Sequence, residues 1–144
     1  MKRYLLFLLC LFSVSNPITS FAKTPGDEQV AITIAGEAWG EGRLGMYAVA
    51  CVIQNRAKRS HLSPYEITRH GLYGKGNKMA KKGFLAHKKW LLKLVALLNR
   101  LELKDITHGA THFENVEVFG YPNWANGMII TCKIGQHTFF RERR

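Results

Sequence analysis

Long apolar runs are missing from most of this sequence. The most apolar stretch, Tyr4 to Val14, is shorter than the roughly 20 residues that a transmembrane helix needs, which argues against an uncleaved membrane anchor. It follows a basic start and precedes the small-x-small sequence Ser20-Phe21-Ala22, as in a secretory signal peptide. We therefore expect residues 1–22 to be a signal peptide and residues 23–144 to form one exported domain, located in the periplasm or the extracellular cell-wall space.

Cysteines are scarce, with three in the chain. Cys10 lies in the predicted signal peptide and would be lost with it. Cys51 and Cys132 then remain, an even pair in a compartment that permits disulfides. A bridge between them is conceivable, but we expect two separate buried thiols that behave as small hydrophobic side chains.

Acidic side chains are also few. Ten Asp and Glu residues stand against 21 Lys and Arg residues, which gives a formal net charge of +11 at pH 7. Such an excess favours an anionic partner, and peptidoglycan with its peptide carboxylates, nucleic acid and an anionic membrane all qualify. The charge also serves solubility, so it does not separate these partners by itself.

Two of the few acidic residues stand in an unusual setting. Glu37 and Glu41 lie among glycines, alanines and Trp39, and the mostly apolar segment 44–56 follows them. If the stretch stays helical, both carboxylates fall on one face with their Cβ atoms about 5 to 6 Å apart. A glutamate held against apolar groups has its charged form disfavoured, and it can then act as a proton donor near neutral pH.

The hydrophobic pattern predicts helices first and a small sheet last. We expect helices over 29–35, 44–58, 63–68 and 86–101, and strands over 111–113, 128–133 and 138–141, with the last two joined as a hairpin through 134–137. The glycine-rich basic stretch 69–82 is expected to be a surface loop. The resulting fold class is α+β, with N-terminal helices packed on a small C-terminal antiparallel sheet.

Several short motifs carry a family resemblance. In chain order they are Glu37-Ala38-x-Gly40-Glu41, Gly45, Ala48-Val49, Asn55-Arg56, Gly109-Ala110-Thr111-His112-Phe113, Pro122, Trp124 and Ile134-Gly135-x-His137-x-Phe139-Phe140-Arg141. With these motifs the chain resembles the SleB/CwlJ family of cell-wall hydrolases. The resemblance implies a compact, lysozyme-like fold and cleavage of peptidoglycan glycan strands, and it makes peptidoglycan rather than nucleic acid the expected partner of a monomeric enzyme.

The resemblance points to Glu37 as the catalytic acid/base of a lytic transglycosylase that cuts the bond after N-acetylmuramic acid. The structural alternative for Glu37 is a carboxylate at a helix end that is balanced by an arginine. Glu41 is interpreted as a structural or substrate-orienting partner that pairs with Arg43 or Arg56. In the alternative reaction, a water-using muramidase or glucosaminidase, Glu41 takes part in catalysis.

Aromatic and hydrogen-bonding side chains supply a candidate wall for a sugar-binding cleft. The candidate substrate-binding residues are Trp39, Thr111, His112, Asn115, Tyr121 and Trp124. Phe113, Phe139 and Phe140 are interpreted as the core of the sheet. Asn55 and Arg56 are expected to brace the central helix.

No metal site and no cofactor are predicted. His108 and His112 have the spacing of a helical zinc pair, but the residues between them include no glutamate base and no third ligand is evident. A non-catalytic basic module that binds cell wall or another polyanion remains the alternative outside the enzyme class.

Overall fold

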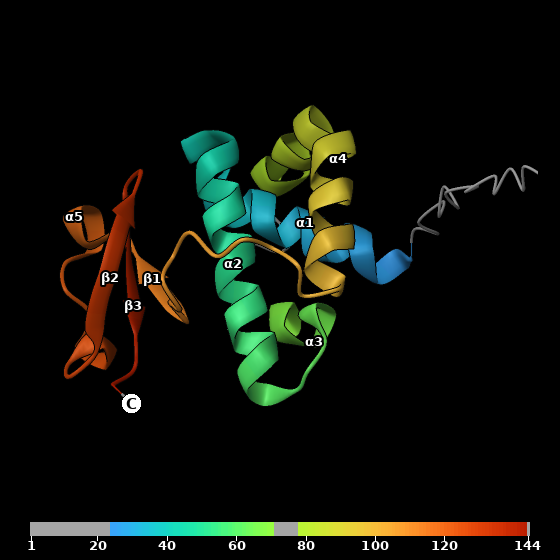
Figure 1. Cartoon of the computed structure of the whole chain (residues 1–144). Coiled ribbons are helices and arrows are strands. Elements are labelled where there is room, and N and C mark those ends of the chain that lie inside the picture. The colour runs from blue at the N-terminus through green and yellow to red at the C-terminus, as the bar shows by residue number, and fades with distance from the viewer. Residues whose placement is uncertain (1–23, 71–77, 144) are drawn as a thin grey trace, which may run out of the picture.

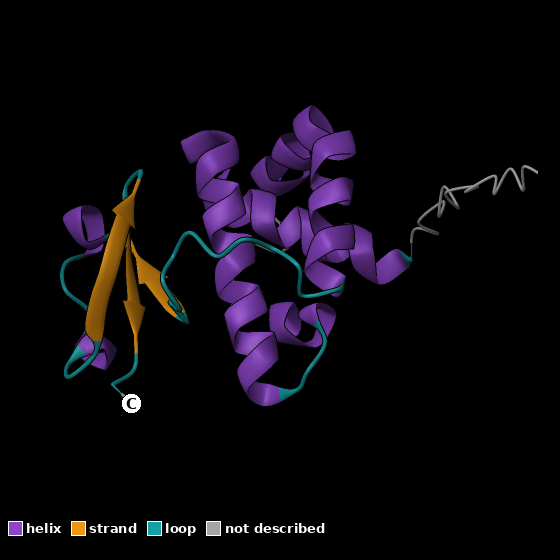
Figure 2. Cartoon of the chain, in the orientation of Figure 1, coloured by secondary structure: helices purple, strands orange, loops and turns teal. Residues whose placement is uncertain are grey.

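The computed structural model describes residues 24–70 and 78–143, and it shows a group of helices beside a small sheet (Figure 1). Figure 2 shows that the strands and the helical group occupy different sides of the molecule. This arrangement confirms the predicted α+β class. The predicted signal peptide and residues 71–77 of the predicted basic loop lie outside the described residues.

The first helix, α1 (Pro25–Ala38), is longer than the predicted helix over 29–35. It begins early because Thr24 and Asp27 form a capping box, in which the Thr24 hydroxyl accepts from the Asp27 N–H and the Asp27 carboxylate accepts from the Thr24 N–H. A short 3₁₀ turn (Trp39–Glu41) follows, and then Gly42 has a φ of +68°. The helix is therefore broken between the two glutamates, in the stretch where Gly40 and Gly42 lie close together.

The central helix α2 (Gly42–Ser60) matches the predicted helix over 44–58 and buries two faces. One face packs with α1 and α4 in the main core, and the other carries Ala48 and Val52 against Phe139 of the sheet. After α2, a capping box of Ser63 and Glu66 starts α3 (Pro64–Arg69) close to the predicted position.

Helix α4 (Lys78–Asn99) begins well before the predicted start at residue 86, so residues 78–82 are helical and not part of a loop. Gly83 explains the difference, since it reads as a helix breaker but packs against Trp39 here. A Cβ at this position would lie 2.6 Å from the Trp39 Cγ atom. The apolar spacing of this helix predicts that Trp90, Leu94, Val95, Leu97, Leu98 and Leu101 lie inside. Leu94, Val95 and Leu98 are buried, Trp90 and Leu101 are partly buried, and Leu97 is 38% exposed.

The sheet contains β1 (His112–Glu114), β2 (Ile129–Ile134) and β3 (His137–Arg141), in the antiparallel order β1-β3-β2. Two short helical pieces, α5 (Val116–Phe119) and a 3₁₀ turn (Asn123–Ala125), lie between β1 and β2. Phe113 pairs with Phe139 and His112 pairs with Phe140 across β1 and β3. Phe139 and Phe140 are fully buried and Phe113 is partly buried, so these phenylalanines form sheet core as predicted.

A linker between α4 and β1 ties the helices to the sheet. Figure 1 shows this segment running across α2. The Gln54 side chain exchanges two hydrogen bonds with the backbone of Leu103, and Asn55 donates to Asp105 and to the Ala110 carbonyl. The predicted bracing role of Asn55 is thus a set of bonds between the helix and this linker.

Both described cysteines are free thiols; Cys51 is buried, as predicted, whereas Cys132 is only partly buried. The Sγ atom of Cys51 lies 3.6 Å from the Lys104 carbonyl oxygen, and burial raises the pKa of this thiol to about 11. Among the described helices, none combines the length and the apolar character that a membrane span requires.

Candidate active site

Glu37 lies in the last turn of α1 and is partly buried, beside the fully buried Ala35 and the nearly buried Ala38. Its negative charge acts on Arg56 of α2. Burial lowers the pKa of the Arg56 guanidinium, and the charge of Glu37 opposes that shift. The carboxylate and the guanidinium are therefore electrostatic partners across the crossing of α1 and α2.

Arg56 also reaches the sheet. Its Nε atom donates to the backbone oxygen of Thr111 at 2.5 Å, directly before β1. The Thr111 N–H donates in turn to the Phe140 carbonyl on β3 at 2.9 Å. Arg56, on α2, thus connects Glu37 at the end of α1 with Thr111 directly before β1. This role goes beyond the predicted bracing of α2.

His112 is the first residue of β1 and lies beside Thr111, whose Oγ1 atom is 2.9 Å from the imidazole Nδ1. Burial lowers the pKa of His112, the charges of Arg56 and Arg59 lower it further, and Glu142 opposes them. The ring centroid of Trp124 lies 5.2 Å from that of His112. These two rings form one aromatic surface at the start of β1, as the sequence predicted for a sugar-binding wall.

The Glu41 side chain contacts the sheet, whereas Glu37 is the partner of Arg56 on α2. The Oε1 atom of Glu41 lies 2.9 Å from Nδ1 of His137 on β3, and both side chains are 12% exposed. Its Oε2 atom is buried and has no hydrogen-bond partner among the described residues. Added Cβ atoms at Gly45 and Gly135 would collide with the Glu41 side chain, so these two glycines make room for it.

The predicted pairing of Glu41 with Arg43 or Arg56 is therefore wrong. The placement of both carboxylates on one face required a continuous helix from Glu37 to Glu41, and the break after α1 means that this condition is not met. The Glu41 carboxylate lies against the His137 imidazole and not against Arg43 or Arg56, and the Arg43 guanidinium instead lies 5.6 Å from the ring centre of Trp90.

The other predicted wall residues divide into two groups. Tyr121 joins the His112 surface through Phe140, whose ring is 5.8 Å from Tyr121 and 5.4 Å from Trp124. Asn115 instead caps α5, where its side chain accepts from the Val118 N–H.

Trp39 packs on Gly83 of α4 and has the Lys82 ammonium 5.7 Å from its ring centre. The structure therefore brings together Thr111, His112, Tyr121 and Trp124. It gives Asn115 and Trp39 contacts in other parts of the fold.

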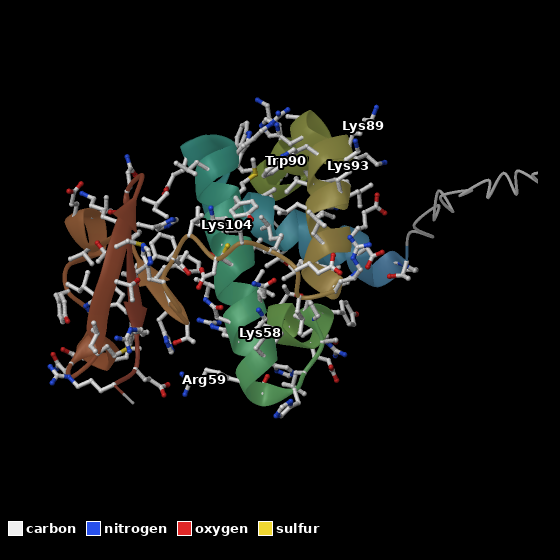
Figure 3. All side chains as sticks on the ribbon, viewed as in Figure 1. Lys58, Arg59, Lys89, Trp90, Lys93 and Lys104 are labelled. Atoms are coloured by element: carbon white, nitrogen blue, oxygen red, sulfur yellow. The ribbon has the colours of Figure 1, made fainter. Side chains whose placement is uncertain are left out.

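His137, Arg59 and Glu142 were not among the predicted site residues. His137 stands in the motif that carries the family resemblance, which is the signal that could have drawn attention to it. Arg59 and Glu142 form an ion pair at 2.5 Å between the last turn of α2 and the end of β3. Figure 3 shows Arg59 on the side of α2 that faces the sheet.

Two hollows lie next to this ion pair. One, of about 530 Å³, is lined by Arg59, His108, Gly109, Arg141, Glu142 and Arg143. The second has a volume of about 460 Å³. It is lined by the first residue of β1, by residues between β1 and β2, and by the two residues after β3, namely His112, Trp124, Asn126, Gly127, Met128, Glu142 and Arg143. Because Glu142 and Arg143 line both, the hollows are adjacent, and the second includes the aromatic surface of His112 and Trp124.

Within residues 24–70 and 78–143, no three His, Cys, Asp or Glu side chains gather as a metal site would require. The polar groups of the site are a carboxylate, a guanidinium and an imidazole from three different elements. Such a set can donate and accept protons and can hold polar ligands beside an aromatic surface.

Comparison with known proteins places the chain in a family. A family model described as Cell Wall Hydrolase matches residues 40–140. This range includes Glu41, Arg56, His112 and His137 and begins three residues after Glu37. No curated protein and no solved structure gave a significant match. The chain therefore belongs to the SleB/CwlJ-type family of cell-wall hydrolases, whose members act on peptidoglycan.

Proposed function

We propose that this protein is exported and cuts the glycan strands of peptidoglycan as a lytic transglycosylase. The bond cut is the one after N-acetylmuramic acid, and Glu37 is the single acid/base. Export is supported by the signal-like features of residues 1–22, and the substrate class is supported by the family match.

In the proposed reaction, Glu37 first donates its proton to the glycosidic oxygen, and the bond from this oxygen to C1 of the muramic acid breaks. The resulting carboxylate then accepts the proton of the C6 hydroxyl of the same sugar, whose oxygen bonds to C1. A 1,6-anhydro ring closes, Glu37 is protonated again, and no water is consumed. Arg56 is the partner of the charged form of Glu37 between the two proton transfers.

The position of Glu41 is the observation that favours transglycosylation over hydrolysis. Glycosidases that use water typically need a second carboxylate beside the scissile bond. Glu41 is largely buried, packed against Gly45 and Gly135, and in contact with His137. The carboxylate of Glu142, which lies nearer to His112, is held by Arg59. One oxygen of each carboxylate is thus in contact with a basic side chain, which disfavours both as the base that activates a water molecule for attack on C1.

The substrate wall in this proposal is the surface of His112 and Trp124. Aromatic rings offer apolar faces to sugar rings, and the Trp124 side chain is available because the residue is 44% exposed. The lowered pKa of His112 keeps its imidazole neutral near pH 7, so one ring nitrogen can donate a hydrogen bond while the other accepts. Thr111 sets the orientation of this ring through its contact with Nδ1.

Hydrolysis with participation of Glu41 is the second candidate reaction. It is favoured by one observation, the buried Oε2 atom of Glu41 that lacks a hydrogen-bond partner. An unsatisfied carboxylate oxygen of this kind can accept a hydrogen bond from a water molecule.

Digestion of purified glycan strands in heavy-oxygen water separates the two reactions. Transglycosylation leaves the new muramic end unlabelled and lighter by one water than a hydrolysed end, whereas hydrolysis introduces the heavy oxygen there. Mass spectrometry of the soluble products is expected to show unlabelled anhydro ends. Label at the new sugar end would overturn transglycosylation, and release of free peptides from intact glycan would overturn glycosidase activity.

A further inference from the structure

The first of the two hollows is lined by more positive than negative side chains. Arg59, Arg141 and Arg143 contribute three guanidinium groups to a hollow with one lining carboxylate, that of Glu142. Glu142 is already in contact with Arg59. Among the described residues, Arg141 has no ion-pair partner, and the Nε atom of Arg143 donates to the backbone oxygen of Gly127. The hollow therefore offers guanidinium groups to an anion.

The part of the lining formed by His108 and Gly109 is held in a defined shape. Asp105 accepts hydrogen bonds from the Thr107 N–H at 2.8 Å and from the Gly109 N–H at 2.7 Å. Burial acts to raise the pKa of Asp105, but these bonds and those from the side chains of Thr107 and Asn55 lower it overall. The turn that carries His108 and Gly109 is thus fixed by a charged cap, and both residues adopt positive φ angles. A fixed wall reduces the entropy lost when a ligand binds.

The hollow adjoins the proposed sugar wall through Glu142 and Arg143. In peptidoglycan, the peptide stem is attached to the muramic acid, the same sugar at which the proposed cut is made. A muramic acid placed on the surface of His112 and Trp124 would therefore carry its stem beside the arginines. The stem bears free carboxylates, and guanidinium groups bind carboxylates with paired hydrogen bonds.

We propose that the hollow formed by Arg59, His108, Arg141 and Arg143 binds the free carboxylates of the peptide stem. The enzyme is thereby selective for glycan strands that carry peptides over strands from which the peptides have been removed. The placement of the stem rests on the proposed sugar wall, whereas binding of the stem by the arginines is independent of the cleavage reaction.

Calorimetry with the full chain tests this binding apart from turnover. The ligand is a GlcNAc-MurNAc disaccharide carrying a tetrapeptide with free carboxylates, and the comparison ligand is the same molecule with those carboxylates converted to carboxamides. We expect the carboxylate form to bind about tenfold to a hundredfold more tightly, the range for loss of a charge-assisted hydrogen bond. Equal binding of both forms would overturn the proposal, as would binding of inorganic phosphate as tight as that of the stem.

Arg143→Ala and Arg141→Gln are the matching variants, and each is expected to remove most of the preference for the carboxylate form. Arg143 is exposed and follows β3, so its replacement leaves the sheet pairing in place. Lys89→Ala with Lys93→Ala removes the same kind of charge from α4 and should leave the preference unchanged. A loss as large in this lysine control would overturn the assignment to the hollow.

Kinetics on strands with and without peptides then distinguish this inference from the proposed function. Arg141 lines the first hollow and not the one that holds the proposed sugar wall. Arg141→Gln should therefore raise KM about tenfold on peptide-bearing strands and leave kcat, and the KM on peptide-free strands, unchanged. Normal cleavage with no effect of Arg141→Gln would overturn the stem site and leave the transglycosylase proposal standing. Stem binding that depends on Arg141 without any glycan cleavage would overturn the transglycosylase proposal and support the stem site.

Discussion

Oε1 of Glu41 lies 2.9 Å from Nδ1 of His137, and this contact connects the turn after α1 to the hairpin of β2 and β3. Both side chains are 12% exposed, so the contact lies inside the junction of the helices and the sheet. We infer that Glu41 positions the sheet relative to Glu37. Gly45 and Gly135 are part of this arrangement because any larger residue there would meet the Glu41 side chain.

Gly45→Ala should therefore destabilise the protein. The added Cβ would lie 2.5 Å from the Cβ of Glu41, and crowding of this kind typically costs about 1–3 kcal/mol. The higher helix propensity of alanine offsets at most about 1 kcal/mol of that cost. Urea denaturation measures the difference. Gly40→Ala is the matched control, because no atom lies within 4 Å of a Cβ built at Gly40, and a Gly45→Ala protein as stable as this control would contradict the packing described for Glu41.

Gly83→Ala tests the contact that allows α4 to begin at Lys78. Alanine favours a helix interior, but here its Cβ would lie 2.6 Å from Cγ of Trp39. We expect a lower melting temperature and a shift in tryptophan fluorescence as Trp39 moves. Gly26→Ala in α1 is the control, since its Cβ would make an ordinary 3.4 Å contact with Tyr65. If Gly83→Ala were more stable than the wild type, the early start of α4 would need another explanation.

The start of α4 also illustrates what sequence patterns predict and what they miss. The central helix and the three strands were predicted close to their observed positions because their apolar spacing matches a helix or strand period over the whole element. Gly83 interrupts the helical pattern locally, and its compatibility with a helix depends on Trp39, a residue far away in the sequence. Local patterns do not contain such a contact.

The candidate site was also predicted in part and missed in part. The alternative that an arginine balances Glu37 is consistent with the structure, and His112 and Trp124 do form one surface as predicted. The contact of Glu41 with His137 depends on where the hairpin docks on α2, which no periodicity encodes. The assignment of Glu37 as the acid/base remains a prediction that rests on the family resemblance and on its partner Arg56.

His112 should make stability depend on pH. Its pKa is lowered by burial and by the charges of Arg56 and Arg59. Between this lowered value and the ordinary value of about 6.5, the unfolded chain binds a proton that the folded protein does not bind. The free energy of unfolding should therefore fall as the pH decreases through this window.

Unfolding in urea at several pH values between about 5 and 7.5 checks this expectation, because most carboxylates stay charged over that range. His112→Gln should show a flatter profile than the wild type, and His70→Gln, which replaces an exposed histidine, serves as the control. An identical slope in the wild type and His112→Gln would show that His112 titrates alike in both states.

The most direct test of the account is the turnover of Glu37→Gln on purified sacculi, followed as release of soluble muropeptides at saturating substrate. The amide keeps the shape of the side chain but cannot donate the proton, so kcat should fall by about 10² to 10⁴ or more. Pelleting with sacculi should stay near the wild-type value, the melting temperature should fall while the protein still folds because the Arg56 guanidinium loses its anionic partner, and Glu41→Gln should lose less activity. A folded Glu37→Gln protein with near-normal turnover would contradict the assignment, and a dead Glu41→Gln beside an active Glu37→Gln would reverse the roles of the two glutamates.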